Sequence, residues 1–355
     1  MRALVAMSGG VDSSVAAALM LEAGHDVVGV TLKQWEGPDG SLPEAGCCTV
    51  GDAEDARRVA AQLDVPYYVL DYVEEFKSAV VDRFGEMYRA GLTPNPCIEC
   101  NRRVRFKAML DRVEQLDCDV LVTGHHARVT QDATGFHLRK GFDGSKDQSY
   151  VLHMLGQDAL SRVVLPVGEM TKADVRVHAE RLGLRTASKP DSQDLCFVGT
   201  GDYRDFLREH FPDSAHPGTM RDLDSDTVTT HAGTADFTVG QRKGLGVAVG
   251  EPRYVVDIEP ATSTVVIGRK ERLLATGCRV EEVSFVADRP PDDMNVDVKI
   301  RYRSPAVPAR LERDGDDWVV TFGKPHSSVA PGQAAVFYRG DEVLGGGTIT
   351  ASIRE

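Results

Sequence analysis

The sequence has no hydrophobic run approaching the roughly 18 residues that a membrane-spanning helix requires. Its first residues, MRALVAMSGG, lack the long apolar segment and the small-residue cleavage site of a signal peptide. Both absences predict a cytoplasmic protein with no membrane partner. Seven cysteines in such a protein do not predict a disulfide framework, so they indicate metal, redox or catalytic roles.

The chain also lacks an excess of positive charge. It has 41 Lys and Arg against 54 Asp and Glu, a net charge of −13. This balance argues against indiscriminate binding of nucleic acid through its phosphates, although an acidic protein can still carry a local basic surface. RRVRFK (102–107) and KIRYRS (299–304) are two such clusters. A chain of 355 residues is long enough for two or three domains.

Strand and helix patterns alternate over the first 125 residues. The apolar run RALVAM (2–7), which ends in a glycine-rich turn, is typical of a buried parallel strand. Repeated strand–helix units predict a doubly wound α/β domain, in which ligands bind at the carboxyl ends of the strands. Strands are expected at 2–7, 26–32, 67–71 and 119–124, and helices at 13–24, 52–63, 74–90, 103–116 and, behind a Thr171 cap, 171–182.

The pattern changes after residue 126. Residues 126–142 indicate a hairpin, residues 216–270 carry many Gly and Thr residues between short strands, and residues 275–355 are almost all short β runs. The last pattern predicts a small β-barrel. We therefore expect an α/β domain at 1–205, a small mixed or β domain at 206–272 and a β-barrel at 273–355.

The segment SGGVDSS (8–14) joins the first predicted strand to the first helix. Gly9 and Gly10 let backbone N–H groups approach an anion, and the helix N-terminus adds positive potential. Ser8 and Ser13 add hydroxyl donors. Asp12 would repel a phosphate directly, so its expected role is to hold Mg²⁺ that bridges to the phosphates.

This string closely resembles the PP-motif of the N-type ATP pyrophosphatases, although no Lys follows the glycines as it would in the other common phosphate-binding loop. Members of that superfamily cleave ATP to AMP and pyrophosphate while they adenylate a substrate oxygen. They include amidating ligases and RNA thiolases, so the loop alone does not choose the substrate.

Three cysteines form a second candidate site. Cys97 and Cys100 lie in TPNPCIECN (93–101), predicted as a loop, and Cys196 lies in DSQDLCF (191–197). A zinc site would need a fourth ligand, an iron–sulfur cluster with an open iron could use these three, and a catalytic pair needs one nucleophile and one exchanging thiol. The other cysteines are interpreted as loop or packing residues: Cys47, Cys48, Cys118 and Cys278.

Several motifs together resemble the tRNA-specific 2-thiouridylases, which place sulfur on C2 of the wobble uridine. They occur in one order over essentially the whole chain: SGGVDSS, TPNPCIECN, TGHHARV with KDQSYVL, DSQDLCF, GQRKGLG and RYRS with PGQAAVFY. The resemblance implies that 1–205 is the catalytic domain and that the barrel contacts tRNA.

The resemblance also implies a mechanism. Adenylation of the uridine C2 oxygen by ATP creates a leaving group, and a persulfide on Cys196 supplies the sulfur. Cys100 then captures the Cys196 sulfur in a disulfide, which an external thiol must reduce. The implied partners are tRNAs that read Lys, Glu and Gln codons, and a cysteine desulfurase or sulfur-relay protein that loads Cys196.

Binding residues follow from the same resemblance. The ATP set is Ala6, Met7, Ser8, Gly9, Gly10, Val11, Asp12, Ser13, Leu32 and Gly124. The tRNA set is Asn95, Pro96, Cys97, His125, Lys146, Asp147, Gln148, Arg301, Tyr302 and Gln333.

Cys97 departs from the family, because many relatives carry an Asp there that is assigned acid–base work. Two hypotheses follow: a Cys196 persulfide with Cys100 as its partner, which we favour, or a [4Fe–4S] cluster held by Cys97, Cys100 and Cys196. A PP-loop amidating ligase and a non-enzymatic tRNA-binding adaptor are the rival functions.

Overall fold

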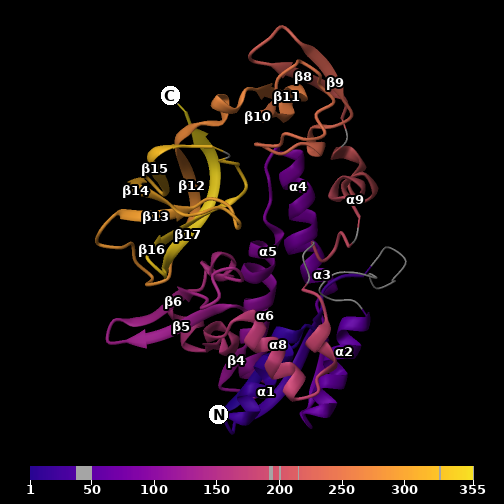
Figure 1. The fold of residues 1–355 in the computed structure, drawn as a ribbon, viewed down its shortest axis with the longest axis vertical. Coiled ribbons are helices and arrows are strands. Elements are labelled where there is room, and N and C mark those ends of the chain that lie inside the picture. Colours follow the sequence, from indigo (N-terminus) through magenta and orange to yellow (C-terminus); the bar gives the residue numbers. More distant parts are fainter. Residues whose placement is uncertain (37–49, 192–194, 200, 215, 328, 355) are drawn as a thin grey trace.

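The computed structural model describes residues 1–36, 50–191, 195–199, 201–214, 216–327 and 329–354. The interpretation of Cys47 and Cys48 therefore falls outside the described residues. Three sheets organise the chain: an α/β region around the N-terminus, a small sheet at the opposite end of the long axis, and a barrel to one side (Figure 1). None of the helices in the described ranges has the length and apolar character that crossing a membrane would require.

The N-terminal sheet has the order β3-β2-β1-β4-β7, and every pair of neighbouring strands is parallel. Strand order reverses at β1, since β2 and β4 lie on its two sides. Sheets of this kind bind ligands in the crevice at the carboxyl ends of the strands beside such a reversal, here β1 and β4. The predicted parallel α/β architecture is confirmed. The strands are β1 (Arg2–Ala6), β2 (Asp26–Lys33), β3 (Tyr67–Asp71), β4 (Val120–Val122) and β7 (Val163–Val164).

Helices cover both faces of this sheet, which is why its strands are almost continuously apolar. Leu4 of β1 packs in the cluster that includes Met109, whereas its neighbours Ala3 and Val5 pack in the cluster that includes Val15. Thr171 and Asp174 form the capping box of α8, as the sequence predicted for this helix start. The helices that pack in these two clusters are α1 (Val11–Glu22), α2 (Val50–Gln62), α6 (Phe106–Gln115), α7 (Gln157–Ser161) and α8 (Lys172–Arg181). Helix α9 (Tyr203–His210) packs in a separate apolar cluster.

Two further helical stretches each contain a widened π turn. The first is α3 (Val73–Phe76), η1 (Lys77–Asp82) and α4 (Arg83–Arg89), and the second is α5 (Pro96–Glu99) and η2 (Cys100–Arg105), which continues into α6. The expected loop around the CxxC pair is thus wrong. Asn95 accepts a hydrogen bond from the Ile98 N–H and Pro96 occupies the first helical position, so a helix begins there.

The rest of the chain forms two β units, and the predicted barrel is confirmed. The small sheet has the order β10-β11-β8-β9, while the barrel has the order β12-β15-β14-β13-β16-β17 and closes through pairing of β12 with β17. The small-sheet strands are β8 (Gly218–Asp222), β9 (Val228–His231), β10 (Tyr254–Glu259) and β11 (Thr264–Gly268). The barrel strands are β12 (Ala275–Phe285), β13 (Asn295–Lys299), β14 (Val307–Asp314), β15 (Asp317–His326), β16 (Ala334–Arg339) and β17 (Glu342–Ile353).

The predicted hairpin connects the N-terminal region to the barrel. Its strands, β5 (Ala127–Asp132) and β6 (Gly135–Lys140), extend the barrel sheet because β6 pairs with β17. Arg128 and Arg139 bind the two carboxylate oxygens of Asp341 at 2.8 and 2.9 Å. The hairpin was expected from the sequence, but its partner strand was not.

Candidate active site

The SGGVDSS segment is a braced turn at the carboxyl end of β1. Gly9 has φ +70°, and a Cβ there would lie 2.2 Å from the Asp52 carbonyl oxygen, so only glycine fits. The Ser13 hydroxyl accepts the Ser8 N–H at 3.1 Å, and the Ser14 hydroxyl donates to the Gly10 carbonyl at 2.8 Å. These bonds brace the loop at the N-terminus of α1, where an anion is favoured.

Gly124 lies against this loop from the end of β4. A Cβ at Gly124 would lie 2.5 Å from the Ser13 backbone nitrogen. Strand β2 ends beside the same edge of the sheet, with Leu32 buried near its carboxyl end. Ala6, Met7, Val11 and Asp12 run from the end of β1 into the start of α1. The fold therefore brings the ends of β2 and β4, with Leu32 and Gly124, to the same edge of the sheet as this loop.

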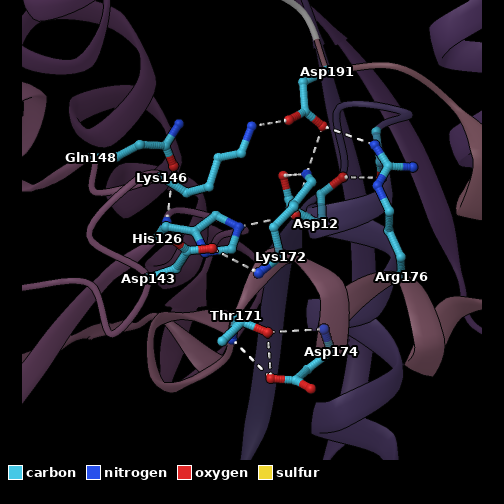
Figure 2. A network of polar contacts seen from close by, with 12 residues as sticks. Asp12, His126, Asp143, Lys146, Gln148, Thr171, Lys172, Asp174, Arg176 and Asp191 are labelled. Atoms are coloured by element: carbon cyan, nitrogen blue, oxygen red, sulfur yellow. Dashed lines mark hydrogen bonds and ion pairs between the residues drawn. The ribbon is translucent and has the colours of Figure 1, made fainter. Parts of the chain in front are cut away.

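Asp12 is the centre of a polar network that the sequence did not reveal (Figure 2). Lys172, at the first position of α8, donates to both Asp12 carboxylate oxygens at 2.8 and 2.7 Å, and His126 Nε2 lies 3.1 Å from Oδ1. Burial alone would raise the pKa of Asp12, but the hydrogen bonds from His126 and Lys172 outweigh it and hold the pKa below its usual value. A buried cation thus faces the loop from across the crevice.

Asp191 joins this network to the segment that leads to Cys196. Its carboxylate accepts Lys172 at 2.7 Å, Lys146 at 2.8 Å and Arg176 at 3.3 Å (Figure 2). Burial opposes ionisation, yet the hydrogen bonds from Lys146 and Lys172 lower the pKa of Asp191 to about 2. The predicted tRNA turn containing Lys146 is therefore linked to the nucleotide loop.

Cys100 and Cys196 belong to the same apolar cluster. Cys100 is 6% exposed among aromatic side chains of α3, α4 and α9, and Cys196 packs partly buried against the same cluster. Phe197, the neighbour of Cys196, lies 5.1 Å from Phe84 between ring centroids. The buried Gln34 side chain, another residue that the sequence did not single out, donates from Nε2 to Cys100 Sγ at 3.4 Å.

Cys97 lies apart from that cluster, on the exposed side of α5. Burial raises the pKa of the Tyr302 phenol on the barrel side, and the charges of Asp147 and Cys97 raise it further. Across the described ranges, no group of three or more His, Cys, Asp or Glu side chains is arranged to hold a metal ion. Cys97, Cys100 and Cys196 thus do not form a ready-made cluster site in this structure.

The barrel holds the TPNP segment in place. Gln333 Nε2 donates to the carbonyl oxygens of Thr93 and Pro94 at 3.1 and 3.2 Å. The Thr93 N–H donates in turn to the Pro331 carbonyl at 2.7 Å. A predicted tRNA residue of the barrel is therefore in contact with the segment that leads into Asn95, more than two hundred positions earlier in the chain.

Two more predicted barrel residues flank this region. Tyr302 is 37% exposed, and Lys299 Nζ lies 5.5 Å from its ring centroid. Arg301 donates to the Val239 carbonyl at 2.8 Å, so its side chain is directed towards the start of the GQRKGLG segment. The barrel thus presents a partly exposed aromatic ring with a nearby cation.

The remaining predicted tRNA residues are tied to the protein interior. His125 is buried, lies 2.7 Å from the Thr123 hydroxyl, and has its pKa lowered by burial to about 3, so it is neutral. Asp147 accepts the Gly141 and Ser149 N–H groups. Gln148 accepts the His126 N–H at 2.9 Å. RNA contact by these side chains stays a prediction.

A PP-type loop at the switch point of a parallel sheet, with two β domains behind it, defines an ATP-using protein of the PP-loop superfamily. Sequence profiles agree: residues 1–200 match the family described as a tRNA methyl transferase HUP domain, residues 204–269 its PRC-barrel domain, and residues 275–349 an aminomethyltransferase β-barrel domain.

Full-length relatives make the assignment specific. The tRNA-specific 2-thiouridylases MnmA of Chloroflexus aurantiacus and Carboxydothermus hydrogenoformans are each 48% identical to the chain, over 98% of it and 97% of their own lengths. A solved 4-thiouridine synthetase in complex with RNA and ATP matches at 19% identity and a TM-score of 0.36, over 60% of this chain and 50% of that one. The chain belongs to the family of tRNA-specific 2-thiouridylases.

Proposed function

We propose that the protein transfers sulfur to C2 of the wobble uridine of tRNA in an ATP-dependent reaction that forms 2-thiouridine. One observation carries the proposal: Cys100 and Cys196, distant in sequence, share one apolar cluster, and the segment leading to Cys196 starts at the nucleotide-loop network. The rival function, a PP-loop amidating ligase, uses ammonia in place of sulfur and needs no such pair of cysteines. Two relatives over nearly the full length are named as 2-thiouridylases, which supports the same reaction.

ATP would bind at the crevice beside β1 and β4. Backbone amides of the loop and the Ser8 and Ser13 hydroxyls suit the phosphates, and Leu32 suits the adenine. Asp12 is a partly exposed carboxylate at the same helix N-terminus, which fits Mg²⁺ coordination, and Mg²⁺ would neutralise phosphate charge there. Lys172 now neutralises Asp12, and we propose that its ammonium contacts the phosphates when ATP binds.

The chemistry follows in three steps. The uridine C2 oxygen attacks the α-phosphorus and pyrophosphate leaves. The terminal sulfur of a Cys196 persulfide then attacks C2, and AMP leaves with the electron pair of its bond. Finally, the Cys100 thiolate attacks Cys196 Sγ, which releases the sulfur on C2 and forms a disulfide that external thiol reduces. Membership of both cysteines in one apolar cluster supports this last step, which requires the two thiols to meet.

The target base would be held where the barrel meets α5. Asn95, Pro96 and Cys97 begin that helix, Gln333 holds the segment before it, and Tyr302 offers a half-exposed ring for stacking. In this proposal Arg301 supports Tyr302, while His125, Lys146, Asp147 and Gln148 support the site from behind. The proposed domains are a catalytic unit at 1–205, a central unit at 206–272 and a tRNA-contacting barrel at 273–355.

The role of Cys97 separates this mechanism from the iron–sulfur alternative. Because the three thiols do not converge among the described residues, we derive no step through a cluster. Protein purified without oxygen and then assayed for iron, acid-labile sulfide and activity distinguishes the two mechanisms. The proposed sulfur donor is a cysteine desulfurase or a sulfur-relay protein that reaches Cys196.

The reaction itself is tested with unmodified tRNA, ATP, Mg²⁺ and a sulfur donor, followed by nucleoside mass spectrometry. We expect 2-thiouridine from the natural chain and from a Cys118→Ser control, and none from Cys100→Ser or Cys196→Ser. Full activity in both Cys100→Ser and Cys196→Ser would contradict the persulfide mechanism. Pyrophosphate release that depends on tRNA would exclude a non-enzymatic adaptor.

A further inference from the structure

The dipeptide that follows β2 contacts both cysteine-bearing segments. Gln34 is 2% exposed and donates from Nε2 to Cys100 Sγ at 3.4 Å. Trp35 lies 6.3 Å from the Phe197 ring, measured between centroids, and Phe197 is the neighbour of Cys196. One short stretch of backbone therefore contacts Cys100 directly and the Cys196 segment through Phe197. Leu32, the predicted adenine neighbour, lies only two residues before Gln34, so the same stretch reaches the nucleotide crevice.

The surroundings of Cys100 create an electrostatic problem. A thiol must ionise to attack sulfur, and burial among aromatic rings disfavours the thiolate. Two arginines of the same helical stretch bind carboxylates: Arg103 binds Glu99 at 2.7 Å, and Arg102 binds Glu282 at 2.9 Å. The titratable and charged groups around the cluster, from its several elements, include Tyr72, Arg83, Tyr88, Glu99, Arg103, Cys196, Tyr203 and His210.

An amide N–H directed at sulfur addresses this problem without adding a charge. A hydrogen bond to the ionised form favours ionisation, and such a bond is stronger to an anion than to a neutral acceptor. The same bond restricts rotation of the Cys100 side chain. A glutamine at this position can only donate to sulfur through its NH₂ group, so it serves the thiolate better than an acidic residue would.

We propose that Gln34 is a positioning residue of the sulfur-transfer reaction, and that its amide holds the Cys100 thiolate in the orientation that meets Cys196. The inference rests on the proposed function. Cys100 loses its proton to water, its sulfur attacks Cys196 Sγ, and the bond from Cys196 to the transferred sulfur breaks with its electron pair on that sulfur. Gln34 donates a hydrogen bond throughout and transfers no proton.

Two variants test the role. Gln34→Met keeps the side-chain length without a donor, and Gln34→Glu replaces the amide by an acceptor. The rate of Cys100 alkylation by iodoacetamide is followed between pH 6 and 10 by peptide mass spectrometry, with Cys118 of the same molecule as an internal reference. Gln62→Leu, which removes an amide hydrogen bond to the Leu182 carbonyl far from the thiols, is the control variant.

We expect Gln34→Met to move the alkylation midpoint of Cys100 upward by about one pH unit, and Gln34→Glu to move it further, because a hydrogen bond to a charged group is worth about one such unit. Cys118 should not change in any variant. In tRNA assays 2-thiouridine formation should fall about tenfold in Gln34→Met while tRNA-dependent pyrophosphate release is kept. Cys100 curves that are unchanged in both folded variants would overturn the proposal. The alkylation curve needs no tRNA, so it remains decisive even if the reaction proposed above is wrong.

Discussion

Lys172 offers the most direct test of the nucleotide site. The residue is only 8% exposed, and its ammonium lies within 2.8 Å of both Asp12 oxygens and 2.7 Å from Asp191. Lys172→Met keeps an unbranched chain and removes the charge. A charge-assisted contact to phosphate is worth about 1.5–3 kcal/mol, so ATP affinity should fall about 10- to 150-fold. Without Lys172, the Asp12 carboxylate would also repel the phosphates, so we expect a loss of ATP affinity near the upper end of this range.

The measurement is ATP titration by calorimetry in the presence of Mg²⁺. Lys172→Arg should recover part of the affinity, since it restores the charge with a different shape. The control variant is Lys270→Met. Lys270 is exposed and lies in the connection between the small sheet and the barrel. If Lys172→Met bound ATP within twofold of the natural chain, Lys172 would be only a structural partner of Asp12 and Asp191.

Three further predictions concern the same site. Gly124→Val should reduce ATP affinity at least about 100-fold, because its side chain would displace the loop amides, whereas Gly144→Ala, with open space around its Cα, should not. Asp191→Asn should lower the free energy of unfolding by about 1–2 kcal/mol at pH 7, more than Asp292→Asn at a 92% exposed carboxylate. The pKa of Asp191 in the folded protein, about 2, lies below its unfolded value, so the carboxylate stabilises the fold only where it is ionised. The difference in thermal stability between the natural chain and Asp191→Asn should therefore shrink as pH falls from about 4 towards 2. A difference that stays constant over this range would contradict the prediction. Gln333→Leu should raise KM for tRNA about tenfold with ATP affinity unchanged, since it frees the segment before the CxxC helix, and an unchanged KM would show that this contact is not needed.

Local signals in the sequence located most elements. Strand β3 occupies the predicted residues 67–71, and helix α8 starts behind its predicted Thr171 cap. Apolar periodicity and capping are decided within a few residues, so they can be seen in one segment alone. The CxxC segment was predicted as a loop, and this was wrong, because Asn95 as a cap and Pro96 at the first position start a helix.

Side-chain partners far apart in sequence were not accessible in the same way. Lys172 carries no motif, and only the packing of α8 against the crevice brings its ammonium to Asp12. Gln34 is an ordinary polar residue after a strand until the fold places Cys100 beside it. Such pairs depend on how elements cross, which a pattern along the chain does not encode.

The sequence by itself determined the parallel α/β domain, the PP-type loop, the β-barrel and the family motifs, because each depends on residues that are neighbours in the chain or on a motif string. Only the tertiary structure decided that Cys100 and Cys196 share one aromatic cluster, that the hairpin 127–140 extends the barrel sheet, and that Gln333 holds the segment before Asn95. Folding buries apolar surface, and this brings together segments that are far apart in the sequence. Which segments become neighbours depends on how well their shapes pack across the whole molecule.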